Sequence, residues 1–148
     1  MARAVLALGA NLEEPALQID RAIAALCNHP QITLLAKSTI IESAPWGKTD
    51  QPSFHNGAIL VETSLSPSAL LEFCLGTEHA IGRVRKERWG PRLIDIDVIA
   101  YDQLVMASDQ LTLPHPHAHE REFVLEPVRE IAPEIAQWLV NRTIEKSA

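Results

Sequence analysis

The sequence contains few of the features that mark disulfide-rich, membrane-spanning or nucleic-acid-binding proteins. Only two of its 148 residues are cysteine, Cys27 and Cys74, and both lie in helical patterns, which favours buried thiols over a disulfide or a metal pair. No apolar run approaches the length of a membrane span, and the N-terminus lacks the pattern of a signal peptide. The net charge of -6 argues against a nucleic-acid partner. We therefore expect a soluble, cytoplasmic monomer with no membrane partner and a single domain over residues 1–148.

Aromatic residues are also scarce, at 5% of the chain, so their positions are informative. Trp46, Phe54, Trp89 and Phe123 are four of the seven aromatics, and three of these four lie in or beside segments rich in Gly and Pro, where core residues are less expected. They either cap a small core or form a slot for a flat ring. A ring stacked in such a slot gains ~0.5–1.5 kcal/mol per contact. The nearby amide of Asn56 suits the edge of a heterocycle.

The pattern of apolar residues predicts the order strand, helix, strand, strand, helix, strand. We expect strands over residues 3–8, 32–42, 54–63 and 93–100. Helices are expected from Pro15 to about Cys27, and from Pro67, after a Ser66 cap, to Gly82. The second helix carries an apolar stripe that includes Leu75. This order is the ferredoxin-like βαββαβ pattern, an α+β fold with an antiparallel sheet and helices.

The segments between and after these elements are less regular. The Gly and Asn of residues 9–12 predict a tight turn, and residues 44–52 predict a loop. After Tyr101 we expect a C-terminal extension. It contains extended chain over residues 111–116, a short helix over 120–131 and a last short strand over 138–144.

The most informative stretch runs from Gly82 to Asp97. Five of the thirteen Lys and Arg residues lie in positions 83–92, and two aspartates, Asp95 and Asp97, follow in an apolar run. Alternate residues of a strand share a face, so both carboxylates point the same way, roughly 6.6 Å apart along the strand. Two like charges on one partly buried face destabilise the fold, and a divalent cation between them removes that problem. Mg²⁺ is usually held by one or two carboxylates together with phosphate oxygens.

Each feature alone has a simpler interpretation, as a solvated basic surface or an exposed strand edge. Their adjacency, with Trp89 between them, favours a site for a polyphosphate nucleotide. Helix geometry would also allow Glu78 to face the same cleft as Asp95. The alternating His115, His117 and His119 could bind a transition metal, but no cysteine lies nearby. A single phosphate-contacting histidine is the preferred interpretation, and the roles of the other two stay open.

The stretch Arg88-Trp89-Gly90-Pro91-Arg92-x-Ile94-Asp95-Ile96-Asp97 resembles the signature of the 6-hydroxymethyl-7,8-dihydropterin pyrophosphokinases. The similarity covers nearly the whole chain. Weaker blocks occur in the right order at residues 8–12, 50–56, 62–63, 114–116 and 120–123. The chain departs from the family pattern at three positions: Ala10 replaces a common Ser, Gln110 an Arg of some members, and Leu75 a polar residue of others.

This resemblance implies Mg²⁺-dependent transfer of diphosphate from ATP to the hydroxymethyl group of 6-hydroxymethyl-7,8-dihydropterin, releasing AMP, in folate biosynthesis. By the same resemblance, Asp95 and Asp97 would hold two Mg²⁺ ions, and the catalytic residues would be Arg83, Arg92, Asp95 and Asp97. The residues implied to bind ATP are Glu78, Arg85, Arg88, Trp89, Arg92, Val98, Thr112, His115 and Arg121. Those implied to bind the pterin are Ser43, Ala44, Trp46, Phe54, Asn56, Trp89, Asp95 and Phe123.

Two rival functions remain open on the sequence. A γ-phosphoryl kinase on the same fold would release ADP in place of AMP. A non-catalytic ferredoxin-like binding module, regulated by nucleotide or metal, is the rival from another class. Such a module has no need for two carboxylates at a strand end, so the Asp95–Asp97 pair favours an enzyme.

Overall fold

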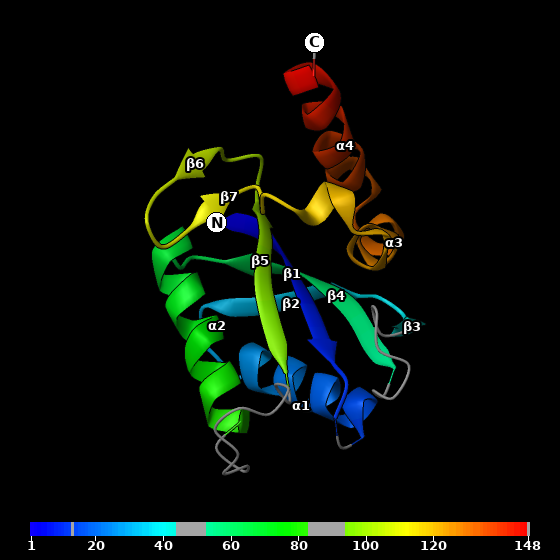
Figure 1. Ribbon diagram of the computed structural model, residues 1–148. Helices are drawn as coiled ribbons and strands as arrows, with labels where there is room; N and C mark the ends of the chain where they lie inside the picture. The colour runs from blue at the N-terminus through cyan, green and yellow to red at the C-terminus, as the bar shows by residue number, and fades with distance from the viewer. Residues whose placement is uncertain (13, 44–52, 83–93, 148) are drawn as a thin grey trace.

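The computed structural model describes residues 1–12, 14–43, 53–82 and 94–147, and within the last helix it describes side chains only to residue 142. A five-stranded antiparallel sheet in the order β2-β4-β1-β5 forms its centre (Figure 1). The strands are β1 (Ala2–Ala10), β2 (Ile32–Lys37), β4 (Phe54–Thr63) and β5 (Asp95–Tyr101), with the short β3 (Ile41–Ser43) also paired to β4. This order confirms the ferredoxin-like α+β prediction.

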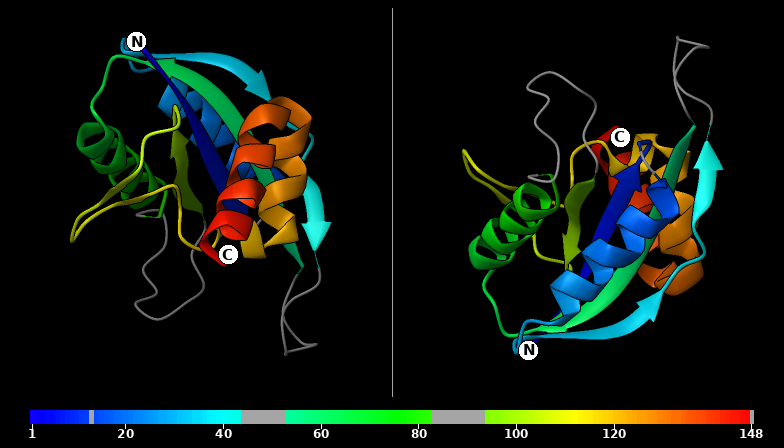
Figure 2. Two further views of the ribbon diagram at one scale, coloured as in Figure 1. Left: turned by 90° about the horizontal axis from the view of Figure 1, so that it is seen from above. Right: turned by 90° about the horizontal axis from the view of Figure 1, so that it is seen from below.

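Four helices cover the two faces of the sheet. Helices α1 (Pro15–Cys27) and α2 (Pro67–Gly82) lie on one face, and α3 (Glu122–Ile131) lies on the other with α4 (Pro133–Ser147) packed against it (Figures 1 and 2). The alternation of β1 supplies both layers: Leu6 and Leu8 are buried toward α1 and α2, and Val5 is buried toward α3. Among the described helices, none has the length and apolar character that crossing a membrane requires.

The predicted helix starts are confirmed. Pro15 opens α1, where a missing backbone N–H costs nothing. At the start of α2, the Ser66 hydroxyl accepts a hydrogen bond from the Ala69 N–H at 3.2 Å, and Pro67 follows the cap. After β5 the chain forms a hairpin of β6 (Met106–Ala107) and β7 (Thr112–Leu113), and then a single 3-10 turn over Ala118–Glu120.

Three local predictions are wrong. Gly9 and Ala10 continue β1 instead of forming a turn, because β4 and β5 pair with the strand on both sides at Gly9. Residues 138–144 belong to α4, not to a strand. Ala136 and Leu139 stand at helical spacing and are buried in the cluster that α3 also enters. Leu75 is 50% exposed, so it stands outside the apolar stripe of α2. The loop predicted over 44–52 lies outside the described residues.

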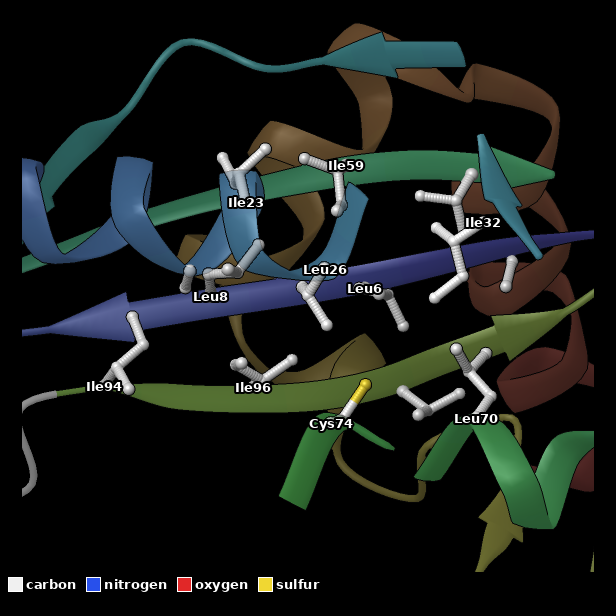
Figure 3. Packing of buried hydrophobic residues seen from close by; sticks show 14 of the residues in the cluster. Leu6, Leu8, Ile23, Leu26, Ile32, Ile59, Leu70, Cys74, Ile94 and Ile96 are labelled. Atoms are coloured by element: carbon white, nitrogen blue, oxygen red, sulfur yellow. The ribbon is translucent and has the colours of Figure 1, made fainter. Parts of the chain in front are cut away.

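Both cysteines are free thiols, as the sequence predicts. Cys74 is fully buried beside Leu70 and Ile96 in the cluster between the sheet and α2 (Figure 3), whereas Cys27 is half-buried at the end of α1. Burial, reinforced by the nearby charges of Glu78 and Asp97, raises the pKa of the Cys74 thiol to about 12. Burial also raises the pKa of Cys27.

We predict that a thiol-specific reagent at pH 8 modifies Cys27 slowly in the native protein and leaves Cys74 unmodified. The thiolate is the reactive form, and the Cys74 thiol is both inaccessible and protonated at this pH. Mass spectrometry of labelled peptides across a urea series would follow both sites. Labelling of Cys74 at the native Cys27 rate, without denaturant, would contradict the packing of α2.

Candidate active site

Strand β5 presents two carboxylates on one face and an apolar row on the other. Ile94, Ile96 and Val98 are only 2%, 2% and 4% exposed and pack toward α1 and α2. Asp95 and Asp97 alternate with them and are half-buried on the opposite side, as the sequence predicts. β5 lies at the end of the sheet order, so Asp97 stands at a sheet edge where surfaces from two sides meet.

A cavity of about 350 Å³ lies over the face of the sheet that carries these carboxylates; we call it the sheet-face cavity. Its walls come from β1, β3, β4, β5 and the start of α3. Five residues expected to bind the pterin meet there. These are Ser43, Phe54, Asn56, Asp95 and Phe123, and the cavity also contains Gly9, Asp97 and Arg121.

The amide of Asn56 is held in place inside this cavity. Asn56 is 8% exposed, and its Nδ2 donates a hydrogen bond to the Ser43 hydroxyl at 3.2 Å. Gly9 pairs with Asn56 across the β1–β4 ladder, and a Cβ on Gly9 would lie only 3.0 Å from the Asn56 Oδ1. Gly9 therefore leaves the room that the amide oxygen occupies. The sequence predicted Gly9 only as a turn residue, although its position in a family block was a usable signal.

A second cavity of about 310 Å³ lies beyond the edge of β5, between α2 and the β6–β7 hairpin; we call it the edge cavity. Five residues of the expected nucleotide and metal sites line it, namely Glu78, Asp97, Val98, Thr112 and His115. Leu75 and Gln110, two of the positions that depart from the family pattern, line it as well. The edge cavity therefore has apolar walls on its α2 side and polar groups near β5.

Among the described residues, Asp97 is the one that lines both cavities. Glu78 fixes the wall between α2 and β5, because its Oε2 accepts a hydrogen bond from the Ile96 N–H at 2.8 Å. Arg121, expected beside the nucleotide, lines the sheet-face cavity instead. The arrangement allows two ligands to approach the same carboxylate from different sides.

Known proteins resemble this chain in sequence and in fold. The sequence model of the family described as 7,8-dihydro-6-hydroxymethylpterin-pyrophosphokinase (HPPK) matches residues 5–133. The chain belongs to this family. A relative from Methylorubrum extorquens, named 2-amino-4-hydroxy-6-hydroxymethyldihydropteridine pyrophosphokinase, is 47% identical over 135 residues, which cover 91% of this chain and 85% of the relative. A Bacillus subtilis protein of the same name is 39% identical over 132 residues, 89% of this chain and 79% of that one.

Solved structures support the fold of this HPPK-family chain. The Plasmodium falciparum HPPK-DHPS triple mutant with STZ-DHP superimposes with a TM-score of 0.71 at 15% identity, over 90% of this chain. The aligned part is 40% of that longer chain, so this protein spans about two fifths of the solved chain. A second Plasmodium falciparum HPPK-DHPS structure, A437G with SDX-DHP, gives a TM-score of 0.72, also at 15% identity, with 90% and 42% covered.

Ala44, Trp46, Arg83, Arg85, Arg88, Trp89 and Arg92 lie outside the described residues. Within the described ranges, no three His, Cys, Asp or Glu side chains come together in a way that could hold a metal ion. In the histidine tract, His117 and His119 both lie against the exposed carboxylate of Glu120, at 3.2 and 3.5 Å.

His115 is the one residue of that tract that lines the edge cavity. Its backbone N–H donates to the Ile99 carbonyl at 2.9 Å, and its Nδ1 accepts from the His117 N–H at 3.2 Å. Burial lowers the pKa of the His115 imidazole below its usual 6.5; Asp97 opposes this shift, and Arg121 and His117 reinforce it. The ring is therefore neutral at pH 7. With Nδ1 accepting, we assign its proton to Nε2.

We predict that His115 titrates below pH 6.5 in the folded protein and weakens the fold in acid. Folding lowers the pKa of His115, so the contribution of its neutral ring to the free energy of unfolding is fully present above pH 6.5. This contribution is lost as the pH falls from 6.5 through the pKa of the folded state. NMR titration of the ring, with urea unfolding at pH 5.5 and 7.5, would measure both effects. In the His115→Gln variant, the difference in unfolding free energy between the two pH values should shrink. An unchanged difference would assign the acid sensitivity to other groups.

Proposed function

We propose that this protein transfers the β,γ-diphosphoryl unit of ATP to the hydroxymethyl oxygen of 6-hydroxymethyl-7,8-dihydropterin and releases AMP, as a step of folate biosynthesis. The names of its relatives indicate this activity. The structural observation that carries the proposal is the meeting of two differently built cavities at Asp97, with Asp95 beside it. In a diphosphoryl transfer the reactive groups of two substrates must meet, and here they would meet beside a carboxylate.

The sheet-face cavity suits the pterin. Its volume of about 350 Å³ lies in the range of small-ligand sites. Phe54 and Phe123 supply rings for stacking, and Asn56 supplies both a donor and an acceptor for the edge of the heterocycle. Asp95 lines the same cavity. In this proposal it orients the hydroxymethyl group. In this proposal Ser43 acts by holding the Asn56 amide, and Ala44, Trp46 and Trp89 remain predicted pterin contacts.

The edge cavity suits the nucleotide. The half-buried Leu71 and the exposed Leu75 form an apolar wall for a base, and Thr112 offers a hydroxyl group. His115 lines this cavity together with Asp97. With its proton on Nε2, it can donate a hydrogen bond to a phosphate oxygen. We assign Glu78 a positioning role, because its carboxylate is bonded to the backbone of Ile96.

The residues present fit Mg²⁺. Asp95 and Asp97 share a face and line one cavity, and one or two carboxylates are the usual protein ligands of Mg²⁺, with phosphate oxygens and water completing its shell. We propose that these two aspartates hold two Mg²⁺ ions. When bound, such ions neutralise charge on the phosphate oxygens and orient the transferring group.

The proposed reaction forms a bond from the pterin oxygen to the β-phosphorus and breaks the bond between that phosphorus and the oxygen bridging to the α-phosphorus. AMP leaves with the bridging oxygen, and the hydroxyl proton leaves to solvent. His115 and Arg121 approach the phosphates from the two cavities and stabilise their negative charge. Arg83 and Arg92 are the further predicted catalytic cations, and Arg85 and Arg88 remain predicted ATP contacts.

We also propose that residues 1–148 work as one monomeric domain in the cytoplasm. Both hydrophobic clusters pack on the same sheet, which supports one folding unit. The two free thiols fit a reducing compartment.

The function is tested by identifying the products of a mixture of protein, Mg²⁺, ATP and 6-hydroxymethyl-7,8-dihydropterin. We expect AMP and the pterin diphosphate in equal amounts, and no AMP when the pterin is omitted. Release of ADP with a pterin monophosphate would establish a γ-phosphoryl kinase instead. Binding of nucleotide without any product would favour the non-catalytic module.

We predict that Asp97→Asn lowers kcat/KM by about a hundredfold or more, because it removes a metal-binding charge at the point where both substrates meet. The fold should keep its stability or gain some, since one of two neighbouring like charges is lost. Steady-state AMP formation and urea unfolding would measure these effects. Asp20→Asn is the matched control, as Asp20 is exposed on α1 and pairs only loosely with Lys37 at 3.9 Å. Wild-type turnover in Asp97→Asn would refute the metal assignment.

We predict that Gly9→Ala weakens pterin binding about tenfold or more and leaves ATP binding unchanged. The added Cβ would lie 3.0 Å from the Asn56 Oδ1 and displace the amide that faces the heterocycle. Calorimetric titration with each substrate separates the two effects. Gly76→Ala is the control, because among the described residues nothing outside its own stretch of α2 backbone lies within 4 Å of its added Cβ. Equal pterin affinity in Gly9→Ala would remove Asn56 from the recognition of the pterin.

A further inference from the structure

The edge of the sheet beside β4 is interrupted between β2 and β3. Its pairing stops at Lys37 and resumes at Ile41, and the three residues between them, 38–40, stand opposite only two residues of β4, 57–58. The extra residue makes this segment a bulge. Bulges near active sites commonly change the direction of the strand that follows them. Here the strand that follows is β3, which ends at Ser43 in the sheet-face cavity.

Ser38 ties one side of the bulge to β4. Its backbone N–H donates to the Ala58 carbonyl at 2.9 Å, and its hydroxyl accepts from the Ala58 N–H at 2.8 Å. The same hydroxyl donates to the Thr39 carbonyl at 2.9 Å. Ser38 is 5% exposed, so these bonds are shielded from water. The bulge is therefore a defined conformation of the edge strand.

Thr39 ties the other side of the bulge to α3. Its backbone N–H donates to Glu130 Oε2 at 2.9 Å, and its hydroxyl donates to Glu130 Oε1 at 2.8 Å. Both carboxylate oxygens are therefore used by one residue that is 91 positions away in the sequence. We call this pair of bonds the Thr39–Glu130 clamp. Two simultaneous bonds to a carboxylate fix direction as well as distance.

The clamp connects α3 to the segment that leads into β3. Both α3 and β3 line the sheet-face cavity with the end that lies away from the clamp. Glu130 lies in the last turn of α3, and Phe123 in its first turn lines the cavity. Ser43 lines the cavity at the end of β3 and accepts the Asn56 amide hydrogen bond. Helix α3 is already seated on the sheet by buried residues such as Val128. Within the described residues, β3 pairs with β4 at the three positions 41–43. The clamp therefore acts mainly on β3, by holding its start against a fixed helix.

We infer that Thr39 and Glu130 are positioning residues for the pterin: by fixing the direction of β3, they set where Ser43 stands and thus how the Asn56 amide is presented. This inference rests on the proposed function, because it assigns the pterin to the sheet-face cavity. Neither residue lines either substrate cavity described above. Their effect reaches the pterin through Ser43 and Asn56, and it leaves the nucleotide side untouched.

The test uses substitutions that change the clamp and little else. Thr39→Val keeps the shape of the side chain and removes its hydroxyl donor, Thr39→Ser keeps the donor, and Glu130→Gln removes the charge and one acceptor. Glu126→Gln, an exposed position on the same helix, is the matched control. Calorimetry would measure the affinity for 6-hydroxymethyl-7,8-dihydropterin with Mg²⁺ and a non-hydrolysable ATP analogue present, and the affinity for the analogue alone. Urea unfolding and AMP formation complete the set.

We expect Thr39→Val and Glu130→Gln each to weaken pterin binding about three- to tenfold, with the analogue affinity unchanged. The double variant should lose less than the product of the two single losses, because both remove the same contact. Thr39→Ser and Glu126→Gln should bind the pterin like the wild type.

Three different results would overturn the inference, and they can be told apart. If the wild type forms AMP and all variants bind the pterin equally, the clamp has no positioning role and the proposed function stands. If the affinities for pterin and analogue fall together with the stability, the variants have lost structure in general, and the clamp has no positioning role. If the wild type neither binds the pterin nor forms AMP, the proposed function fails and the clamp inference fails with it.

Discussion

The register of β1 between β4 and β5 is the constraint on which the site depends. Gly9 pairs with Asn56 on one side and with Asp95 on the other. The Asn56 amide and the Asp95 carboxylate therefore flank a position without a side chain in one row across the sheet. Two residues further along the strands, Asp97 stands opposite Ala7. Side chains alternate along a strand with a period of two, so a slip of one residue would turn both aspartates into the core and Ile96 toward the ligands. The packing that fixes the fold therefore also fixes the chemistry.

The same register explains why polar groups are tolerated on a largely buried sheet. The face toward α1 and α2 carries a cluster of buried apolar residues, whereas the opposite face carries both the apolar cluster with α3 and the sheet-face cavity. On this face Asn56, Asp95 and Asp97 line the sheet-face cavity together. Neighbouring carboxylates repel each other, and a bound cation would relieve this repulsion.

Much of this could be predicted from the sequence, because local patterns determine it. The alternation of Asp95 and Asp97 with apolar neighbours indicated their common face, and Ser66 with Pro67 indicated the start of α2. Features that depend on distant partners could not be predicted. Gly9 has the chemistry of a turn residue and becomes a strand residue only because two strands flank it. The segment after Trp138 is short, and its apolar and polar residues alternate too irregularly to show a helical spacing. Its helix is determined by packing against α3.

The position of Arg121 and the bonds between Thr39 and Glu130 belong to this second kind, since both depend on where α3 lies. The basic stretch from Arg83 to Arg92 lies outside the described residues, and its proposed role rests on the family resemblance.

The central claim is that the two substrates occupy separate cavities and meet at Asp97. Anomalous diffraction from a crystal grown with Mn²⁺, a non-hydrolysable ATP analogue and 6-hydroxymethyl-7,8-dihydropterin tests it most directly. We expect Mn²⁺ peaks bound by Asp95 and Asp97, the pterin between Phe54 and Phe123, and the nucleotide beside Thr112 and His115. Metal bound away from these carboxylates, or both ligands in a single cavity, would contradict it.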